Sequence, residues 1–154
     1  MTLGHPRDPP ALQHTPVTDT PAQDDTSAEN SVSLRLANGP LAAPVLCRVV
    51  SMVLARADCP MDRLDDAMIV CDTLSAHAPA YSSDGHLTFT LATDKRGIEL
   101  RVSELAARGA GKLIADATVP GVGNVLERLS DELQIEPSGA DDSGEDLVLK
   151  LRFG

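Results

Sequence analysis

Four segments of this chain alternate between apolar and polar residues, and this alternation constrains the fold more than any other feature of the sequence. The segments are residues 31–37, 86–93, 98–102 and 147–153. Because successive side chains of a strand point to opposite faces, each segment predicts a strand with one buried and one solvated face. Residues 94–97 supply a turn that joins the second and third strands as a hairpin.

Other segments carry the helical period instead. Residues 41–57 repeat apolar residues at helical spacing and predict a helix with a wide apolar face. Residues 61–78 predict a second helix, which Pro79 ends. We expect a third helix over residues 122–133, with a short strand near residues 134–135 as an addition. Residues 106–120, rich in Ala and Gly, predict a mobile loop with a short helical piece.

The order β-α-α-β-β-loop-α-β does not suit the strict βαβ repeat of a parallel sheet. It predicts an α+β fold, a two-layer sandwich in which about three helices pack on one face of a mixed, mostly antiparallel sheet. Residues 31–154 would form this domain. Residues 1–30 hold five prolines and few large apolar residues, which predicts a disordered tail; an interaction arm is the alternative.

Composition and charge exclude several classes of function. The net charge of −10 repels phosphate backbones, which argues against direct nucleic-acid binding and suits a basic protein partner. No run approaches the roughly 20 apolar residues of a membrane span, and the polar start is not that of a signal peptide. The odd number of cysteines, without a CxxC pair, predicts buried free thiols rather than a secreted disulfide framework. We therefore expect a cytoplasmic protein with no membrane partner.

Residues 45–50 (VLCRVV) in the first helix, residues 71–78 (CDTLSAHA) in the second, and residues 100–133 carry a family resemblance. In order and spacing, residues 31–153 resemble the anti-sigma-factor serine kinases, which belong to the histidine-kinase-like ATPase (GHKL) superfamily. An arginine in the first helix of these kinases meets the sigma factor, and Arg48 matches it. A plain solvated helix cation is the alternative for Arg48.

The second stretch concerns catalysis. In the family this helix carries a Glu, which activates the attacking hydroxyl, and an Asn four residues later, which holds magnesium. One register puts Asp72 and Ala76 at these positions, and the other puts Thr73 and His77 there. Alanine offers magnesium no side-chain oxygen and imidazole suits it poorly, so neither register retains the pair. Asp72 is the candidate catalytic base, and an exposed helix acid is the alternative.

The third stretch concerns the cofactor, which in the family is ATP with magnesium. Glu104 stands where the family has the Asp that accepts from the adenine amine, and Ala106 replaces a close glycine. Gly121 and Gly123 resemble the family's Gly-x-Gly, whose amides face phosphate, after a slip of one position. A solvated strand-end acid and a loop that needs glycine are the alternatives.

These substitutions lead to one main hypothesis and two alternatives. We expect a regulatory domain that sequesters a sigma factor or binds an anti-sigma antagonist, with a degenerate ATP site, no cofactor and possible homodimerisation. The first alternative is an active ATP-dependent serine kinase that phosphorylates an antagonist protein and uses Asp72 as its base. The second is an unrelated α+β binding domain. No metal-ligand spacing is present among the histidines.

Overall fold

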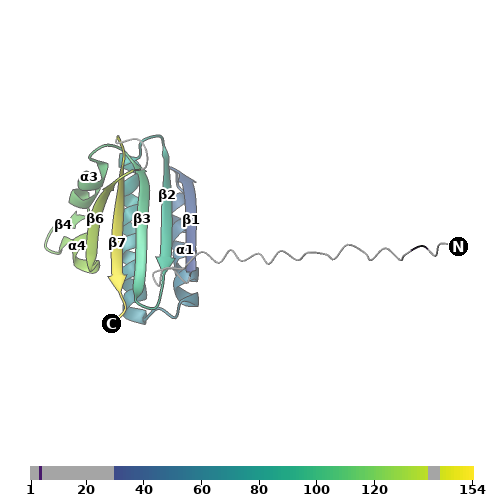
Figure 1. Cartoon of the computed structure of the whole chain (residues 1–154). Helices are drawn as coiled ribbons and strands as arrows, with labels where there is room; N and C mark the ends of the chain where they lie inside the picture. Colours follow the sequence, from purple (N-terminus) through teal and green to yellow (C-terminus); the bar gives the residue numbers. More distant parts are fainter. Residues whose placement is uncertain (1–3, 5–29, 139–142) are drawn as a thin grey trace.

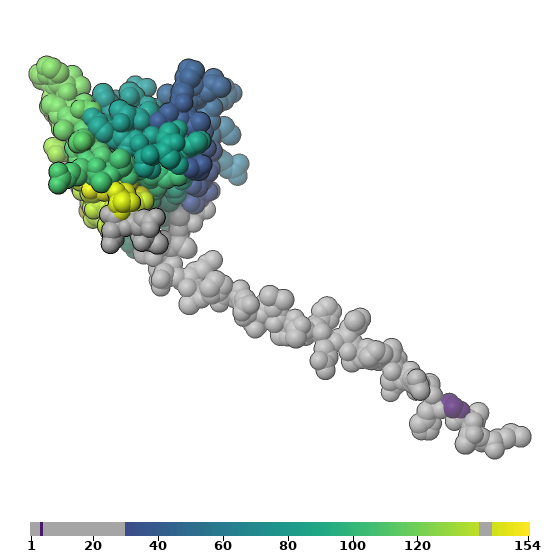
Figure 2. Space-filling view, turned by 90° about the horizontal axis from the view of Figure 1, so that it is seen from above, coloured from purple at the N-terminus to yellow at the C-terminus, as the bar shows by residue number. Residues whose placement is uncertain are grey.

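The computed structural model describes residue 4, residues 30–138 and residues 143–154, which Figure 1 and Figure 2 draw in colour. The predicted tail therefore lies, apart from Gly4 and Asn30, outside the described residues. Along the chain the elements are β1 (Asn30–Ala37), α1 (Ala42–Arg56), α2 (Met61–His77), the 3-10 helix η1 (Ala78–Tyr81), β2 (His86–Thr93), β3 (Gly97–Leu105), α3 (Gly109–Asp116), β4 (Thr118–Val119), β5 (Gly123–Asn124), α4 (Val125–Leu129), β6 (Glu132–Pro137) and β7 (Glu145–Arg152).

A five-stranded sheet in the order β1-β2-β3-β7-β6 forms one layer of the molecule. Every pairing of neighbours in it is antiparallel. The expected sheet was mixed but mostly antiparallel; the described sheet contains no parallel pair. Helices α1 and α2 lie behind this sheet (Figure 1), so the α+β two-layer architecture is confirmed.

The core lies between the sheet and the helices. Every second residue of β2 is buried, as the alternation predicts, and the same holds along β3 up to Val102. These side chains meet a stripe of α1 formed by Leu46, Val50 and Leu54. With so few aromatic residues available, leucine and valine fill most of this core by close aliphatic packing.

The opposite face of the sheet carries mainly polar side chains, as expected for an antiparallel sheet covered on one side only. Ser33 and Arg35 of β1 point to this open face, next to Thr88 and Thr90 of β2. The hydroxyl groups of Ser33 and Thr90 lie 3.1 Å apart and join the two strands across this face.

The helices are of moderate length, with 15 residues in α1 and 17 in α2. Within the described ranges, no helix is both long and apolar enough to cross a membrane. Helix α3 occupies part of the stretch expected to be a loop with a short helical piece. Tyr81, at the end of η1, donates a hydrogen bond to Asp116, at the end of α3, and so links these two elements.

The predicted helix over residues 122–133 is wrong in extent. Helix α4 spans only Val125–Leu129 because the Asn124 side chain caps its start and Ser130 adopts an extended backbone conformation. The amide of Asp131 then donates to the carbonyl of Lys150, 2.8 Å away, and Leu133 pairs with Leu149 as a residue of β6. Leu126, Leu129 and Leu133 have helical spacing, but sheet pairing with β7 determines the conformation of Leu133.

Candidate functional site

Helix α1 carries a second apolar stripe that faces solvent. Leu41, just before the helix, is 74% exposed, Val45 is 40% exposed and Met52 is 60% exposed. Arg48 lies on the same side, because positions 41, 45, 48 and 52 follow the spacing of one helical face. The core already takes the Leu46 stripe, so these residues remain on the surface. We call Leu41, Val45, Arg48 and Met52 the outer face of α1.

Helix α2 extends this surface with a charged margin. A four-residue connection joins α1 and α2, and Cys47 Sγ lies 3.5 Å from Cys71 Sγ, so the two helices pack side by side as a hairpin. Because the two helices run antiparallel and meet at Cys47 and Cys71, Arg48 lies at about the same height along the pair as Ile69, which is 49% exposed. Asp65 and Asp72 are also exposed and share the helical face of Ile69.

The charged groups of this surface are one arginine, Arg48, and two aspartates, Asp65 and Asp72. Among the residues that the structure describes, neither Arg48 nor Asp72 has a side-chain hydrogen bond or an ion pair. The surface therefore combines exposed apolar side chains with unpaired charges of both signs. An apolar centre with a polar margin is the usual composition of a protein-binding patch.

The predicted catalytic positions lie on the outer side of α2. The first alignment register places Asp72 and Ala76 at these positions, and both residues are exposed. In the second register, the Thr73 hydroxyl already donates to the carbonyl of Ile69 at 2.8 Å. His77 is half-buried at the end of the helix.

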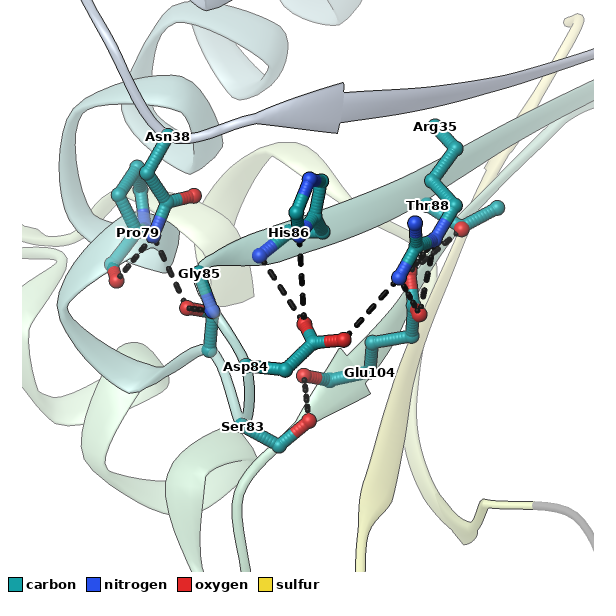
Figure 3. Close-up of polar contacts among 10 residues, drawn as sticks. Arg35, Asn38, Pro79, Ser83, Asp84, Gly85, His86, Thr88 and Glu104 are labelled. Atoms are coloured by element: carbon teal, nitrogen blue, oxygen red, sulfur yellow. Dashed lines mark hydrogen bonds and ion pairs between the residues drawn. The ribbon is translucent and has the colours of Figure 1, made fainter.

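Glu104 occupies a strained position in β3 (Figure 3). Its φ of 69° is left-handed, and the pairing with β7 shifts by one residue between Val102 and Leu105, which makes this a β-bulge. A left-handed φ is costly for a residue other than glycine, so the surrounding contacts must hold it.

Those contacts come from β1, β2 and the turn before β2. Arg35 donates to Glu104 through Nη2 at 2.9 Å and through Nε at 3.1 Å, and its Nη2 also donates to Asp84 at 3.0 Å. Thr88 Oγ1 donates to Glu104 Oε2 at 2.7 Å. The hydrogen bond from Arg35, aided by Thr88, lowers the pKa of the Glu104 carboxyl below its ordinary value, against the opposing effect of partial burial. We call Arg35, Asp84, Thr88 and Glu104 the open-face network.

Hydrogen bonds between side chains and backbone groups hold the turn that carries Asp84 (Figure 3). The amide of His86 donates to Asp84 Oδ1 at 3.0 Å, and the Ser83 hydroxyl donates to the carbonyl of Glu104 at 3.1 Å. Both hydrogen bonds therefore tie the turn to the ends of β2 and β3. The network fastens the β2–β3 hairpin to β1.

Glu104 and Asp72 are not brought together. Glu104 reaches the open face of the sheet through Thr88, whereas Asp72 lies on the outer side of a helix that covers the other face. A surface pocket with a volume of about 330 Å³ lies at the β2–β3 turn, between Arg96, Glu132 and Arg152. Asp72, Glu104 and Gly121 do not line it.

Gly121 and Gly123 belong to the small hairpin of β4 and β5 before α4. Both have a positive φ, 81° and 97°, so their role in the turn explains why glycine stands there. The neighbouring amides already have acceptors, since that of Val122 donates to Val119 and that of Val125 to Ala117. The Glu127 amide donates to the Asn124 side chain at 3.1 Å. These amides are therefore engaged within the chain.

In residues 30–138 and 143–154, no group of three or more His, Cys, Asp or Glu side chains is placed to hold a metal ion.

Two features of the structure were not anticipated from the sequence. The exposure of Leu41, Val45 and Met52 was not expected, because the spacing of residues 41–57 predicts only one wide apolar face. The presence of two adjacent apolar stripes, wider than one buried face requires, was the available signal. The open-face network joins Arg35 to Glu104 across 69 positions of the chain, and nothing in the local pattern signals such a pair.

No protein-family model matches the chain, and no curated protein is similar to it.

Proposed function

We propose that this chain is a regulatory domain that captures a protein partner on the outer face of α1 and the adjoining part of α2. The observation that carries this proposal is the exposure of Leu41, Val45 and Met52 around the unpaired Arg48. Large aliphatic side chains grouped on one helical face are costly to leave in water, and a partner would remove them from it.

Charge favours a basic partner. The chain carries a net charge of −10, and Asp65 and Asp72 border the apolar residues of the proposed surface. Opposite charge speeds encounter and fixes the orientation of the partner. Arg48 would then pair with a single acidic group of the partner near the centre of the contact, where buried arginines contribute most to affinity.

We take the proposed class of partner from the resemblance to anti-sigma-factor kinases. It implies a sigma factor or an anti-sigma antagonist that meets the first helix, where Arg48 stands. The basic character expected of the partner favours the sigma factor. The separation of Asp72 from Glu104 favours a stoichiometric binder over an active kinase, because phosphoryl transfer depends on positioning these groups around one nucleotide.

Calorimetric titration of the full chain with sigma factors and antagonist proteins of the same organism tests the proposal. We expect saturable binding to at least one of them. Arg48→Ala should raise the Kd at least tenfold, about 1.4 kcal/mol. Lys112→Ala is the matched control, because Lys112 is exposed on α3, away from α1, and its side chain has no ion pair within the described ranges. It should leave the Kd unchanged.

Two results would contradict the proposal. One is the absence of binding to every sigma factor and antagonist; the other is equal binding by Arg48→Ala and the unmodified chain. A parallel titration with ATP and magnesium addresses the kinase alternative. Magnesium-dependent ATP binding, with phosphorylation of an antagonist that Asp72→Asn abolishes, would establish the enzyme instead.

A further inference from the structure

Two cysteines from different helices lie in contact inside the helical layer. Cys47 Sγ of α1 is 3.5 Å from Cys71 Sγ of α2. A disulfide requires the sulfur atoms to approach to about 2.05 Å, so a movement of about 1.5 Å would join them. Cys47 follows Leu46, a residue of the stripe by which α1 contacts the sheet, and its side chain meets α2 beside that stripe.

The two thiols differ in their access to solvent. Cys71 is fully buried, whereas Cys47 is only partly buried. Burial, together with the contact with Cys47, raises the pKa of the Cys71 thiol far above its ordinary value. An oxidant from solvent meets Cys47 first because Cys47 is the more exposed thiol, and Cys71, whose sulfur lies 3.5 Å away, is the neighbour that can attack the oxidised sulfur. The raised pKa keeps the Cys71 thiol protonated at rest, so its attack is the slower of the two steps.

We propose that Cys47 and Cys71 are a modification site that a peroxide converts to a reversible disulfide between α1 and α2. The sulfur of Cys47 attacks one oxygen of hydrogen peroxide, the O–O bond breaks, and the leaving hydroxide takes up the thiol proton to form water. The sulfur of Cys71 then attacks the sulfenic sulfur of Cys47, the S–O bond breaks, and the second hydroxide takes the proton of Cys71. Two thiols and one peroxide give one disulfide and two waters.

The bond would tie the two helices together beside the outer face of α1, because Cys47 is the residue before Arg48 and its side chain faces α2. The cross-link closes a loop that includes the connection between the helices. This inference stands on the contact of the two sulfurs and does not depend on the identity of any partner.

Cys59 provides an internal control. It lies in the connection between the helices, and its Sγ donates to the carbonyl of Pro60 at 3.5 Å instead of meeting another cysteine. The full-length chain should be treated with hydrogen peroxide, alkylated with iodoacetamide, digested without reductant and mapped by mass spectrometry. We expect a peptide pair linked through Cys47 and Cys71, with Cys59 alkylated, and recovery of all three thiols after dithiothreitol.

Variants make the assignment decisive. Cys47→Ser should abolish the linked pair, and because Cys47 is only partly buried this variant does not disturb the fully buried side of the contact. Cys59→Ser should leave it unchanged. Full alkylation of all three cysteines after peroxide, a linkage through Cys59, or irreversible oxidation of Cys47 as the main product would each overturn the proposal.

Discussion

At the scale of single residues, Glu104 illustrates how a surface side chain can stabilise an unfavourable backbone conformation. Its left-handed φ lies at the bulge of β3, and its carboxylate collects hydrogen bonds from Arg35 and Thr88. The resemblance assigned Glu104 to a nucleotide base. Its lone pairs are instead engaged by the protein, so the residue now has a structural explanation that needs no ligand.

The open-face network predicts a pH dependence of stability. The pKa of Glu104 is lower in the folded chain than its ordinary value of 4.5, because the folded state stabilises the charged form. Its contribution to the free energy of unfolding is therefore present above pH 4.5 and is lost as the pH falls through the lower, folded pKa.

Urea denaturation at several pH values checks this dependence. Glu104→Gln should be less stable than the unmodified chain at pH 7, and the difference should shrink as the pH is lowered below 4.5. Asp65→Asn, which alters an exposed carboxylate of α2 outside the network, corrects for the general effect of removing a charge. A difference for Glu104→Gln that is constant across the whole range would refute the expectation.

At the scale of elements, the predictions succeeded where a single periodicity decided the structure. The alternating segments became β1, β2, β3 and β7, and the first two helices begin and end within a residue of the expected bounds. Strands β2 and β3 are central in the sheet with one buried face, so their alternation is sharp.

The failures came where distant pairing competed with local pattern. Residues 122–133 carry helical spacing, yet β6 begins at Glu132 because β7, which follows it in sequence, offers an edge to pair with. For the candidate site, too, one part could be predicted from the sequence and another could not. Arg48 could be singled out as a surface cation, but the contacts of Glu104 depend on β1 and β2, which no local signal connects to it.

Two glycines in different elements should respond oppositely to alanine. At Gly97, where β3 runs beside β7, an added Cβ would lie 2.2 Å from the carbonyl oxygen of Leu151. Gly97→Ala should therefore cost about 1–3 kcal/mol of unfolding free energy. At Gly111, inside α3, an added Cβ meets nothing within 4 Å. Gly111→Ala should stabilise the chain by up to about 1 kcal/mol, because alanine favours helix.

Chemical denaturation of both variants beside the unmodified chain measures the two effects. Equal stability of Gly97→Ala and Gly111→Ala would show that the backbones of β3 and β7 are not as close as described.

At the scale of the whole molecule, one continuous core joins both layers. Buried residues from α1, α2, α3, α4 and the central strands belong to a single cluster. Within the described residues these elements share one hydrophobic core. Loss of packing at one point should therefore lower the stability of the whole domain.

A pair of variants on α1 tests this cooperation. Leu54 is 0% exposed and Met52 is 60% exposed, although they are two residues apart. Leu54→Ala should lower the free energy of unfolding by about 2–5 kcal/mol, whereas Met52→Ala should change it by less than about 0.5 kcal/mol. Thermal unfolding followed by circular dichroism gives both values. A small effect at Leu54 would mean that α1 does not belong to the common core.

The hydrogen bond between Tyr81 and Asp116 makes Tyr81 an intrinsic optical probe of this part of the fold. The sequence contains one tyrosine and no tryptophan, so tyrosine emission from the folded chain originates at a single ring. That ring sits where η1 meets α3, and its hydroxyl donates to a carboxylate. Such a hydrogen bond quenches the emission of the phenol, so the emission should rise when the hydrogen bond breaks. Tyrosine emission can therefore report the separation of η1 from α3 without any label, while circular dichroism follows the unfolding of the rest of the molecule.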